Sequence, residues 1–209
     1  MSDPNLPRAP DPAGWRAQRS TAARNEAAIL EAAERLLRAK GPEGADVHEI
    51  AAAASVGVGT VYRRFGNKAS LIAAVAGEQE RELQDAMLDG PPPLGPGAPP
   101  RERLEAFLRT LCRHIESYLD ALVAGDAAAP RGRHGSGAYN AWRLHAAVLL
   151  RDIGTGGDPE WTADLLLGAV QPLLYRHQRR ERGLSAAGIE DELVAAARRL
   201  TAGTAPPAV

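Results

Sequence analysis

The chain has 209 residues, of which 44% are hydrophobic and only 4% aromatic, and its formal net charge at pH 7 is −1. This length and apolar content allow one large or two small domains with a buried core. No apolar run reaches about 18 residues and no signal-peptide segment is recognised, so we expect a cytoplasmic protein with no membrane contact. The single cysteine, Cys112, excludes an internal disulfide and a thiolate metal cluster.

Residues 1–23 form a leader that is rich in proline and arginine. The prolines cluster in its first half and indicate disorder there, whereas the second half can extend the first helix. Arg8, Arg16 and Arg19 give the leader a positive charge that its two aspartates only partly oppose. Such a segment is either a solvated tail, which is slightly favoured, or an arm that lays arginines along DNA.

Two helices are predicted between the leader and residue 55. The first begins near Asn25 and ends at the helix-breaking pair Gly41-Pro42. The second follows Asp46, which can cap it, while Glu49 can bond back to the Asp46 N–H and complete a capping box. The apolar residues of the first helix keep a helical spacing and comprise Ala28, Ile29, Ala32, Ala33, Leu36 and Leu37.

A tight turn and a third short helix follow. Gly57 can adopt the positive φ that such a turn needs. In the helix over residues 58–65, Val61 and Phe65 point one way, and polar and basic side chains cover the remaining surface. Residues 50–77 contain no acidic residue, so a phosphate backbone would meet only positive charge there. This pattern is typical of a helix-turn-helix DNA reader.

The third helix resembles the signature of TetR-type transcriptional regulators, in the segment Val58-Gly59-Thr60-Val61-Tyr62-Arg63-Arg64-Phe65 followed by Lys68 and Leu71. The resemblance covers about Asn25 to Val75. It implies an all-α protein, in which an N-terminal three-helix helix-turn-helix DNA-binding domain is joined by a linking helix to a C-terminal helical domain for ligand binding and dimerisation. It also implies a double-stranded DNA operator as the partner.

The resemblance implies that the third helix enters the major groove, that Tyr62 contacts phosphate and that Lys68 holds the DNA backbone. Arg63 and Arg64 can grip guanine or hold phosphates, and the residues leave open which of them reads a base. Val58 stands where many relatives carry a polar residue, so contact with a thymine methyl can replace one polar contact. The predicted DNA-binding residues are Val58, Gly59, Thr60, Tyr62, Arg63, Arg64 and Lys68.

A helical second domain is expected after a linking helix that runs from Lys68 to Leu88. A Pro- and Gly-rich loop over residues 89–100 interrupts the chain. Further helices are predicted over residues 101–124, 138–152, 161–180 and 189–200, with a Gly-rich loop of undecided role over residues 125–137. The expected division is a flexible basic leader at 1–23, a DNA-binding domain at 24–75, a regulatory and dimerisation domain at 76–203 and a disordered tail at 204–209.

The helix predicted over residues 161–180 is apolar on two sides, so it needs two partners. Pro172 should kink it, because proline lacks an N–H and crowds the preceding turn. The family resemblance implies that this helix and the last one pair with their copies in a homodimer. The predicted interface residues are Trp161, Leu165, Gly168, Ala169, Pro172, Ile189, Leu193 and Ala196.

Several polar and aromatic side chains lie on or beside apolar faces of the second domain. A small-molecule site is mostly apolar with a few converging polar groups, so these residues are candidates for contact with a small, largely apolar effector. Each of them is individually more often a core residue than a ligand contact. The candidates are His114, Tyr118, Trp142, His145, Gln171 and Tyr175.

The sequence therefore predicts a DNA-binding transcriptional regulator, a homodimeric repressor that a small-molecule effector releases from a palindromic operator. The alternative is a DNA-binding regulator without an effector, which would not need so large a second domain. An enzyme would need a nucleophile beside a base and an orienting acid, or a cofactor loop, and neither is recognised. No catalytic residue, metal ligand or cofactor is predicted.

Overall fold

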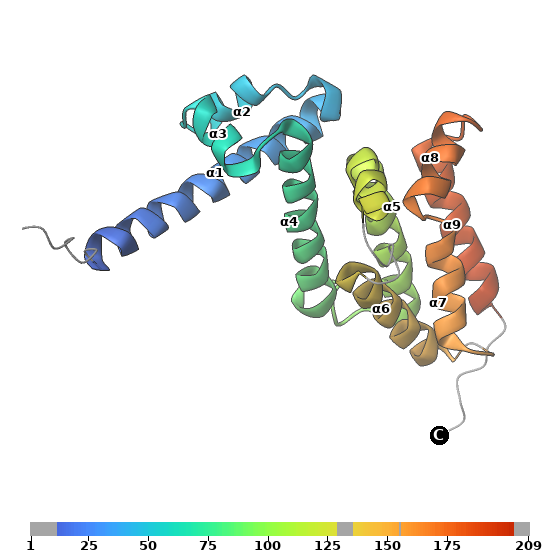
Figure 1. Ribbon diagram of the computed structural model, residues 1–209. Helices are drawn as coiled ribbons and strands as arrows, with labels where there is room; N and C mark the ends of the chain where they lie inside the picture. Colours follow the sequence, from blue (N-terminus) through green and yellow to red (C-terminus); the bar gives the residue numbers. More distant parts are fainter. Residues whose placement is uncertain (1–11, 129–135, 155, 203–209) are drawn as a thin grey trace, which may run out of the picture. The chain divides into compact units, whose positions relative to one another are not determined.

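A computed structural model of the chain describes residues 12–128, 136–154 and 156–202 (Figure 1). Within these ranges the regular secondary structure is entirely α-helical, so the predicted all-α fold class is confirmed. The chain divides into two compact units, residues 1–71 and 72–209. Residues 1–11 of the basic leader, the 129–135 part of the Gly-rich loop and the predicted C-terminal tail lie outside the described residues.

The first unit contains α1 (Pro12–Gly44), α2 (Val47–Ala53), α3 (Val58–Phe65) and the first turn of α4 (Lys68–Asp89). One face of α1 is buried, as its apolar spacing predicts, and α1 packs on α2, which packs on α3. The helical geometry of α1 breaks at Gly41, whose φ is 72°, before a last turn that contains Pro42. The core of this unit is formed by Ile29, Ala32, Ala33, Leu37, Ala45, Val47, Ile50, Ala51, Val61 and Leu71.

Two local predictions about the helix-turn-helix are wrong. The Asp46 side chain caps α2 by accepting from the His48 N–H at 2.6 Å, but Glu49 pairs with Lys40 Nζ at 2.7 Å instead of closing the capping box. The charge-assisted bond between the Glu49 carboxylate and the Lys40 ammonium is stronger than a bond to one neutral backbone N–H, so Glu49 pairs with Lys40. In the turn, Ser55 takes the positive φ of 55°, whereas Gly57 has a φ of −71° and serves as the N-terminal cap of α3.

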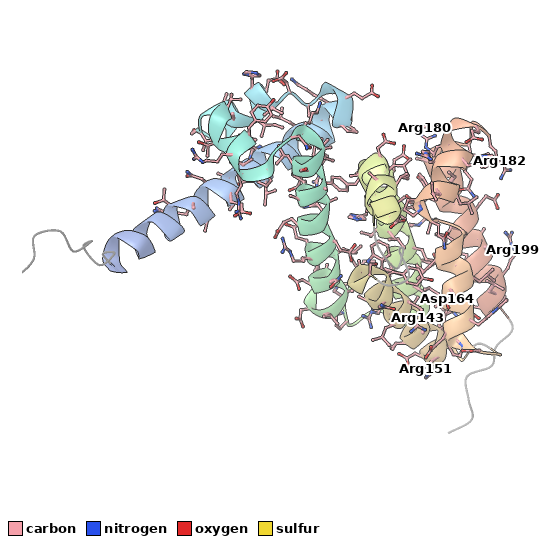
Figure 2. All side chains as sticks on the ribbon, viewed as in Figure 1. Arg143, Arg151, Asp164, Arg180, Arg182 and Arg199 are labelled. Atoms are coloured by element: carbon pink, nitrogen blue, oxygen red, sulfur yellow. The ribbon has the colours of Figure 1, made fainter. Side chains whose placement is uncertain are left out.

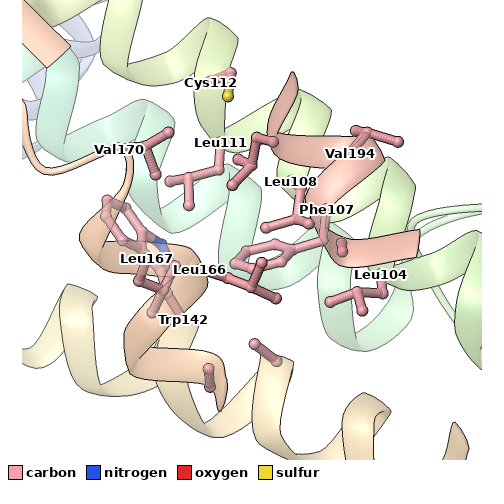
Figure 3. Close-up of a cluster of buried hydrophobic side chains, with 14 of the residues drawn as sticks. Leu104, Phe107, Leu108, Leu111, Cys112, Trp142, Leu166, Leu167, Val170 and Val194 are labelled. Carbon is pink, nitrogen blue, oxygen red and sulfur yellow. The ribbon is translucent and has the colours of Figure 1, made fainter. Parts of the chain in front are cut away.

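The second unit is built around α5 (Pro100–Ala128), which packs against α6 (Gly137–Ile153), α8 (Pro172–Arg180) and α9 (Ala186–Thr201). The remaining helix, α7 (Pro159–Gly168), packs mainly on α6. The apolar stripe predicted for residues 101–124 is confirmed as the centre of this core, together with Trp142 (Figure 3). Its fully buried members on α5 are Leu104, Phe107, Leu108, Leu111 and Ile115.

The single helix predicted over residues 161–180 is wrong. The structure has two helices there: α7 ends at Gly168 and α8 begins at Pro172. Proline disfavours helical geometry in the residue before it, and Gln171 accordingly has a ψ of 137°. Pro172 therefore starts a helix, where its missing N–H costs nothing, rather than kinking one.

Carboxylate–arginine pairs join α5 to the two C-terminal helices. Arg179 on α8 holds Glu116 with two hydrogen bonds of 2.9 Å, from Nε to Oε2 and from Nη2 to Oε1. Arg180 binds Asp120 at 2.8 Å, and Arg109 binds Glu190 of α9 at 2.8 Å. Figure 2 shows that Arg180 lies toward the opposite end of these helices from Arg143, which pairs with Glu160 between α6 and α7. Among the described residues, no helix is both long and apolar enough to cross a bilayer.

Candidate nucleic-acid interface and effector site

The first unit exposes one face of α3 and buries the other. Val61 is buried in the core, whereas Tyr62 is 45% exposed and Arg63 and Arg64 are also exposed. A helix anchored by one apolar side chain leaves its polar face free to meet a nucleic acid. Of the other predicted contacts, Gly59 is exposed, and Val58 and Thr60 are partly buried.

Lys68 lies at the start of α4, as predicted for a residue that holds the DNA backbone. Its Nζ donates to the Glu43 carbonyl oxygen at 3.2 Å, which fixes the ammonium beside the end of α1. Asn67 precedes it, and its Oδ1 accepts from the Ser70 N–H at 2.8 Å. The side chain of Asn67 thus satisfies one of the helix-terminal donors, while the helix dipole and the Lys68 charge still favour an anion there.

An acidic residue that the sequence analysis did not consider lies beside α3. Glu26 on α1 forms an ion pair with Arg64 across 38 positions of sequence. No local pattern could have indicated it, because the two residues meet only when α1 folds across α3. The purely basic field expected around α3 is therefore modified by one carboxylate.

Three of the six predicted effector residues form one aromatic cluster in the second unit. The His114 ring lies 5.4 Å from that of Tyr118 and 6.0 Å from that of Trp142, measured between ring centroids. All three are buried, and α5 departs from helical geometry at Tyr118. His114 Nε2 also lies 3.7 Å from Glu80 Oε2 on α4, a neighbour that no sequence spacing indicated.

The other three predicted effector residues are His145, Gln171 and Tyr175. His145 packs edge-on against Phe107, with centroids 5.1 Å apart, and its Nε2 is buried without a hydrogen-bond partner among the described residues. The Tyr175 N–H donates to the Gln171 carbonyl oxygen at 2.7 Å, and the Tyr175 side chain is fully buried. Tyr175 and Cys112 border a depression of about 410 Å³ between α5 and the α8–α9 region.

Burial keeps the Cys112 thiol and the Tyr175 hydroxyl at this depression neutral. It raises the pKa of the Cys112 thiol to about 12, and it also raises the pKa of Tyr175, with the charge of Glu116 adding to the effect. A thiol with such a pKa carries almost no thiolate near neutral pH. Cys112 therefore acts as a small apolar core residue.

The predicted dimer residues fall into two groups by exposure. Trp161 is 64% exposed and Leu165 is 46% exposed, and Gly168, Ala169 and Ala196 are partly buried. A groove of about 730 Å³ runs between α7 and α9, and Leu165, Ala169, Leu184, Ala196 and Leu200 are among its lining residues. We refer to it as the α7–α9 groove.

Pro172, Ile189 and Leu193 are buried within the subunit itself, and Ile189 and Leu193 also line the α7–α9 groove. Ile189 and Leu193 belong to the core around α5, so they support the α7–α9 groove from beneath. The sequence pattern could not separate them from surface positions, since α9 carries a single apolar stripe that points into this core.

The helix-turn-helix fold and the exposed basic face of α3 define a DNA-binding protein. Residues 29–75 match the family of bacterial regulatory proteins described as the tetR family. The matched residues span most of the helix-turn-helix unit and the start of α4, so this part of the chain is similar to that family.

Solved structures of bacterial regulators share a similar fold over 80–88% of this chain. A transcriptional regulator from Rhodococcus sp. Rha1 has a TM-score of 0.57 at 22% identity, covering 88% of this chain and 97% of its own. A TetR-like transcriptional regulator from Rhodococcus sp. RHA1 has a TM-score of 0.52 at 23% identity, covering 86% and 97%. A transcriptional regulator from Saccharomonospora viridis in complex with choline has a TM-score of 0.56 at 22% identity, covering 80% and 92%. No curated protein matches the chain in sequence.

His145 should make the second unit sensitive to acid. Burial, with a smaller contribution from the charge of Arg103, lowers the pKa of His145 from 6.5 to about 4. His145 therefore takes up a proton more readily in the unfolded state than in the folded state. The contribution of neutral, buried His145 to the free energy of unfolding is complete above about pH 6.5 and is lost as the pH falls through about 4. We expect His145→Gln to reduce the loss of unfolding free energy between about pH 7 and about pH 4.5 by about 1–3 kcal/mol.

Urea denaturation at the two pH values measures this effect. His177→Gln, which removes an exposed histidine of the same unit, is the matched control. An equal reduction in both variants would show that the burial of His145 is not the cause.

Proposed function

We propose that this regulator is a homodimeric repressor that binds a palindromic operator and is released by a small, largely apolar effector. The observation that carries the proposal is the exposed face of α3, which presents Tyr62, Arg63 and Arg64 while Val61 anchors the helix. Guanidinium groups can grip guanine in the major groove, and a tyrosine hydroxyl can bind phosphate. Lys68 supplies a second phosphate contact at the start of α4.

Selection from random duplex DNA tests the DNA-binding part of this proposal. We expect the wild-type protein to enrich one palindrome, with half-sites about 34–36 Å apart or a multiple of that distance. Lys68→Ala should weaken binding to all sequences alike and flatten the salt dependence by about one unit, because one phosphate contact is lost. Arg63→Ala should instead relax the preference at a defined base pair, by roughly 1–3 kcal/mol if the contact is bidentate.

Fluorescence anisotropy over a range of salt concentrations distinguishes these effects. Arg35→Ala is the control, because Arg35 is exposed and pairs with Glu31 of its own helix at 2.9 Å. If wild-type protein enriches no sequence, or if Lys68→Ala loses affinity at only one base identity, these assignments fail.

The dimer is supported by the apolar surface beside the α7–α9 groove. Trp161, Leu165 and Leu200 are large apolar residues that are each more than 40% exposed in the single subunit. Contiguous exposed apolar surface of this kind usually marks an interaction site. A second copy of the chain presents the same surface, so a two-fold axis at the groove would cover both.

Gly168→Arg should separate the subunits. A Cβ atom at Gly168 would meet nothing within 4 Å, so the larger side chain fits the subunit and would obstruct only a partner. We expect light scattering to show a dimer for the wild type and a monomer for the variant at micromolar concentration. The affinity for operator should fall when the dimer is lost, because two linked DNA-binding units bind the two half-sites together more tightly than one unit alone.

Gly125→Arg is the matched control, since a Cβ there also meets nothing within 4 Å and the residue is exposed on α5. Circular dichroism verifies that both variants fold. A wild-type monomer that binds operator tightly would disprove the dimer.

The effector site is supported by the cluster of His114, Tyr118 and Trp142, with Glu80 beside it. A buried aromatic surface with a few polar groups suits a small organic ligand. The regulator from Saccharomonospora viridis, which has a similar fold, was crystallised in complex with choline, so a protein of this fold can bind a small organic molecule. Binding within the second unit would release the operator if the two ligands favour different conformations, and the coupling is then reciprocal.

Trp142→Phe should blunt the response to an effector while leaving operator affinity nearly unchanged. It keeps an aromatic ring in the core but removes contact area and the indole N–H. A panel of small organic compounds, choline among them, is first screened by the rise in thermal unfolding temperature of the wild type. A compound found in this way should then release labelled operator from the wild type at lower concentration than from Trp142→Phe.

Leu144→Ala, at an exposed position on the same helix, is the control. A normal response of Trp142→Phe would place the site elsewhere in the unit. If no compound both stabilises the protein and releases operator, a regulator without an effector is the better description.

A further inference from the structure

Arg64 on α3 is paired with a carboxylate from another helix, whereas its neighbour Arg63 is not. The Arg64 Nη2 atom donates to Glu26 Oε2, and the two side chains are 56% and 32% exposed. Among the described residues, no carboxylate lies within ion-pair distance of Arg63. The two arginines carry the same formal charge, but an approaching phosphate would meet an uncompensated cation only at Arg63.

Both arginines line a groove of about 610 Å³ between α1 and α3. Residues Thr21, Asn25, Glu26 and Ile29 form its α1 wall, and Thr60, Arg63 and Arg64 form its α3 wall. Thr60 and Arg64 lie one turn apart, so the lining includes part of the reading face of α3. The Glu26 carboxylate therefore lies at the edge of the surface that meets DNA.

The pairing affects phosphate binding and base reading differently. A guanidinium has five N–H donors, and the bond to Glu26 leaves donors free to pair with guanine O6 and N7. Attraction to a phosphate depends mainly on net charge, which the adjacent carboxylate reduces. Holding the side chain in one orientation also lowers the entropy lost when a bidentate contact forms.

We propose that Glu26 determines sequence specificity by positioning Arg64 for a base contact and weakening its attraction to phosphates of DNA with the wrong sequence. The inference rests on the proposed role of α3 as the reading helix. Glu26 itself need not touch DNA, because it acts through the Arg64 guanidinium.

The test compares wild type with Glu26→Gln on two duplexes of equal length, the selected operator and a scrambled sequence. The substitution keeps an oxygen that can accept from Arg64 but removes the negative charge. We expect affinity for scrambled DNA to rise by up to about tenfold near 0.1 M salt, and its salt dependence to steepen by up to about one unit, as one further counterion is released. Affinity for operator should change by less than about twofold, so the specificity ratio falls.

Glu31→Gln is the matched control for charge. Glu31 also lies on α1 and pairs with an arginine, but its partner Arg35 is on the same helix, four residues away. Glu31→Gln changes the net charge by the same amount as Glu26→Gln but leaves Arg64 paired with Glu26. It should therefore leave the specificity ratio at the wild-type value.

A double-mutant cycle shows whether Glu26 acts through Arg64. In an Arg64→Ala background, Glu26→Gln should lose most of its effect on the salt dependence and the specificity ratio. A merely structural role would instead lower the thermal unfolding temperature and weaken binding to both duplexes together.

The proposal is overturned if Glu26→Gln matches Glu31→Gln, or if its effect persists in the Arg64→Ala background. The wild-type ratio between operator and scrambled DNA separates this failure from that of the proposed function. A wild type that prefers operator while Glu26→Gln keeps the same ratio disproves only the role of Glu26. A wild type without preference disproves both.

Discussion

The burial of Val61 is the constraint on which the DNA-binding surface depends. The helix α3 has only eight residues, too few to be stable alone, so its conformation and orientation come from packing one side into the first unit. Once Val61 lies in the core, helical periodicity places Tyr62, Arg63 and Arg64 on the remaining surface. The apolar anchor thereby decides which polar groups are available to a nucleic acid.

Ion pairs have different consequences in the two units. In the second unit, Arg109, Arg179 and Arg180 fasten α8 and α9 to α5, and exposed pairs of this kind add modest stability but define geometry. In the first unit, the pair between Glu26 and Arg64 lies on the surface proposed to bind DNA. There the chemical consequence is larger than the contribution to stability, because pairing changes the charge that a phosphate would meet.

The second unit separates its core from its apolar surface through the break between α7 and α8. Because the chain leaves helical geometry before Pro172, Tyr175 is buried while Trp161 and Leu165 stay exposed. The apolar stripe of α9 contributes Ile189 and Leu193 to the core beneath the α7–α9 groove. In a continuous helix, a single helical periodicity would have fixed the directions of Trp161, Leu165 and Tyr175 relative to one another.

The sequence by itself determined the all-α class, the helix-turn-helix and the amphipathic α5, because capping residues, breakers and helical periodicity are local signals. It also identified the exposed residues of α3, since one apolar anchor fixes the rest of so short a helix. Only the tertiary structure decided that Glu26 meets Arg64, that Glu80 meets His114 and that Ile189 belongs to the core. These contacts join residues from different helices, and their formation depends on how the helices cross, which no spacing along one helix records.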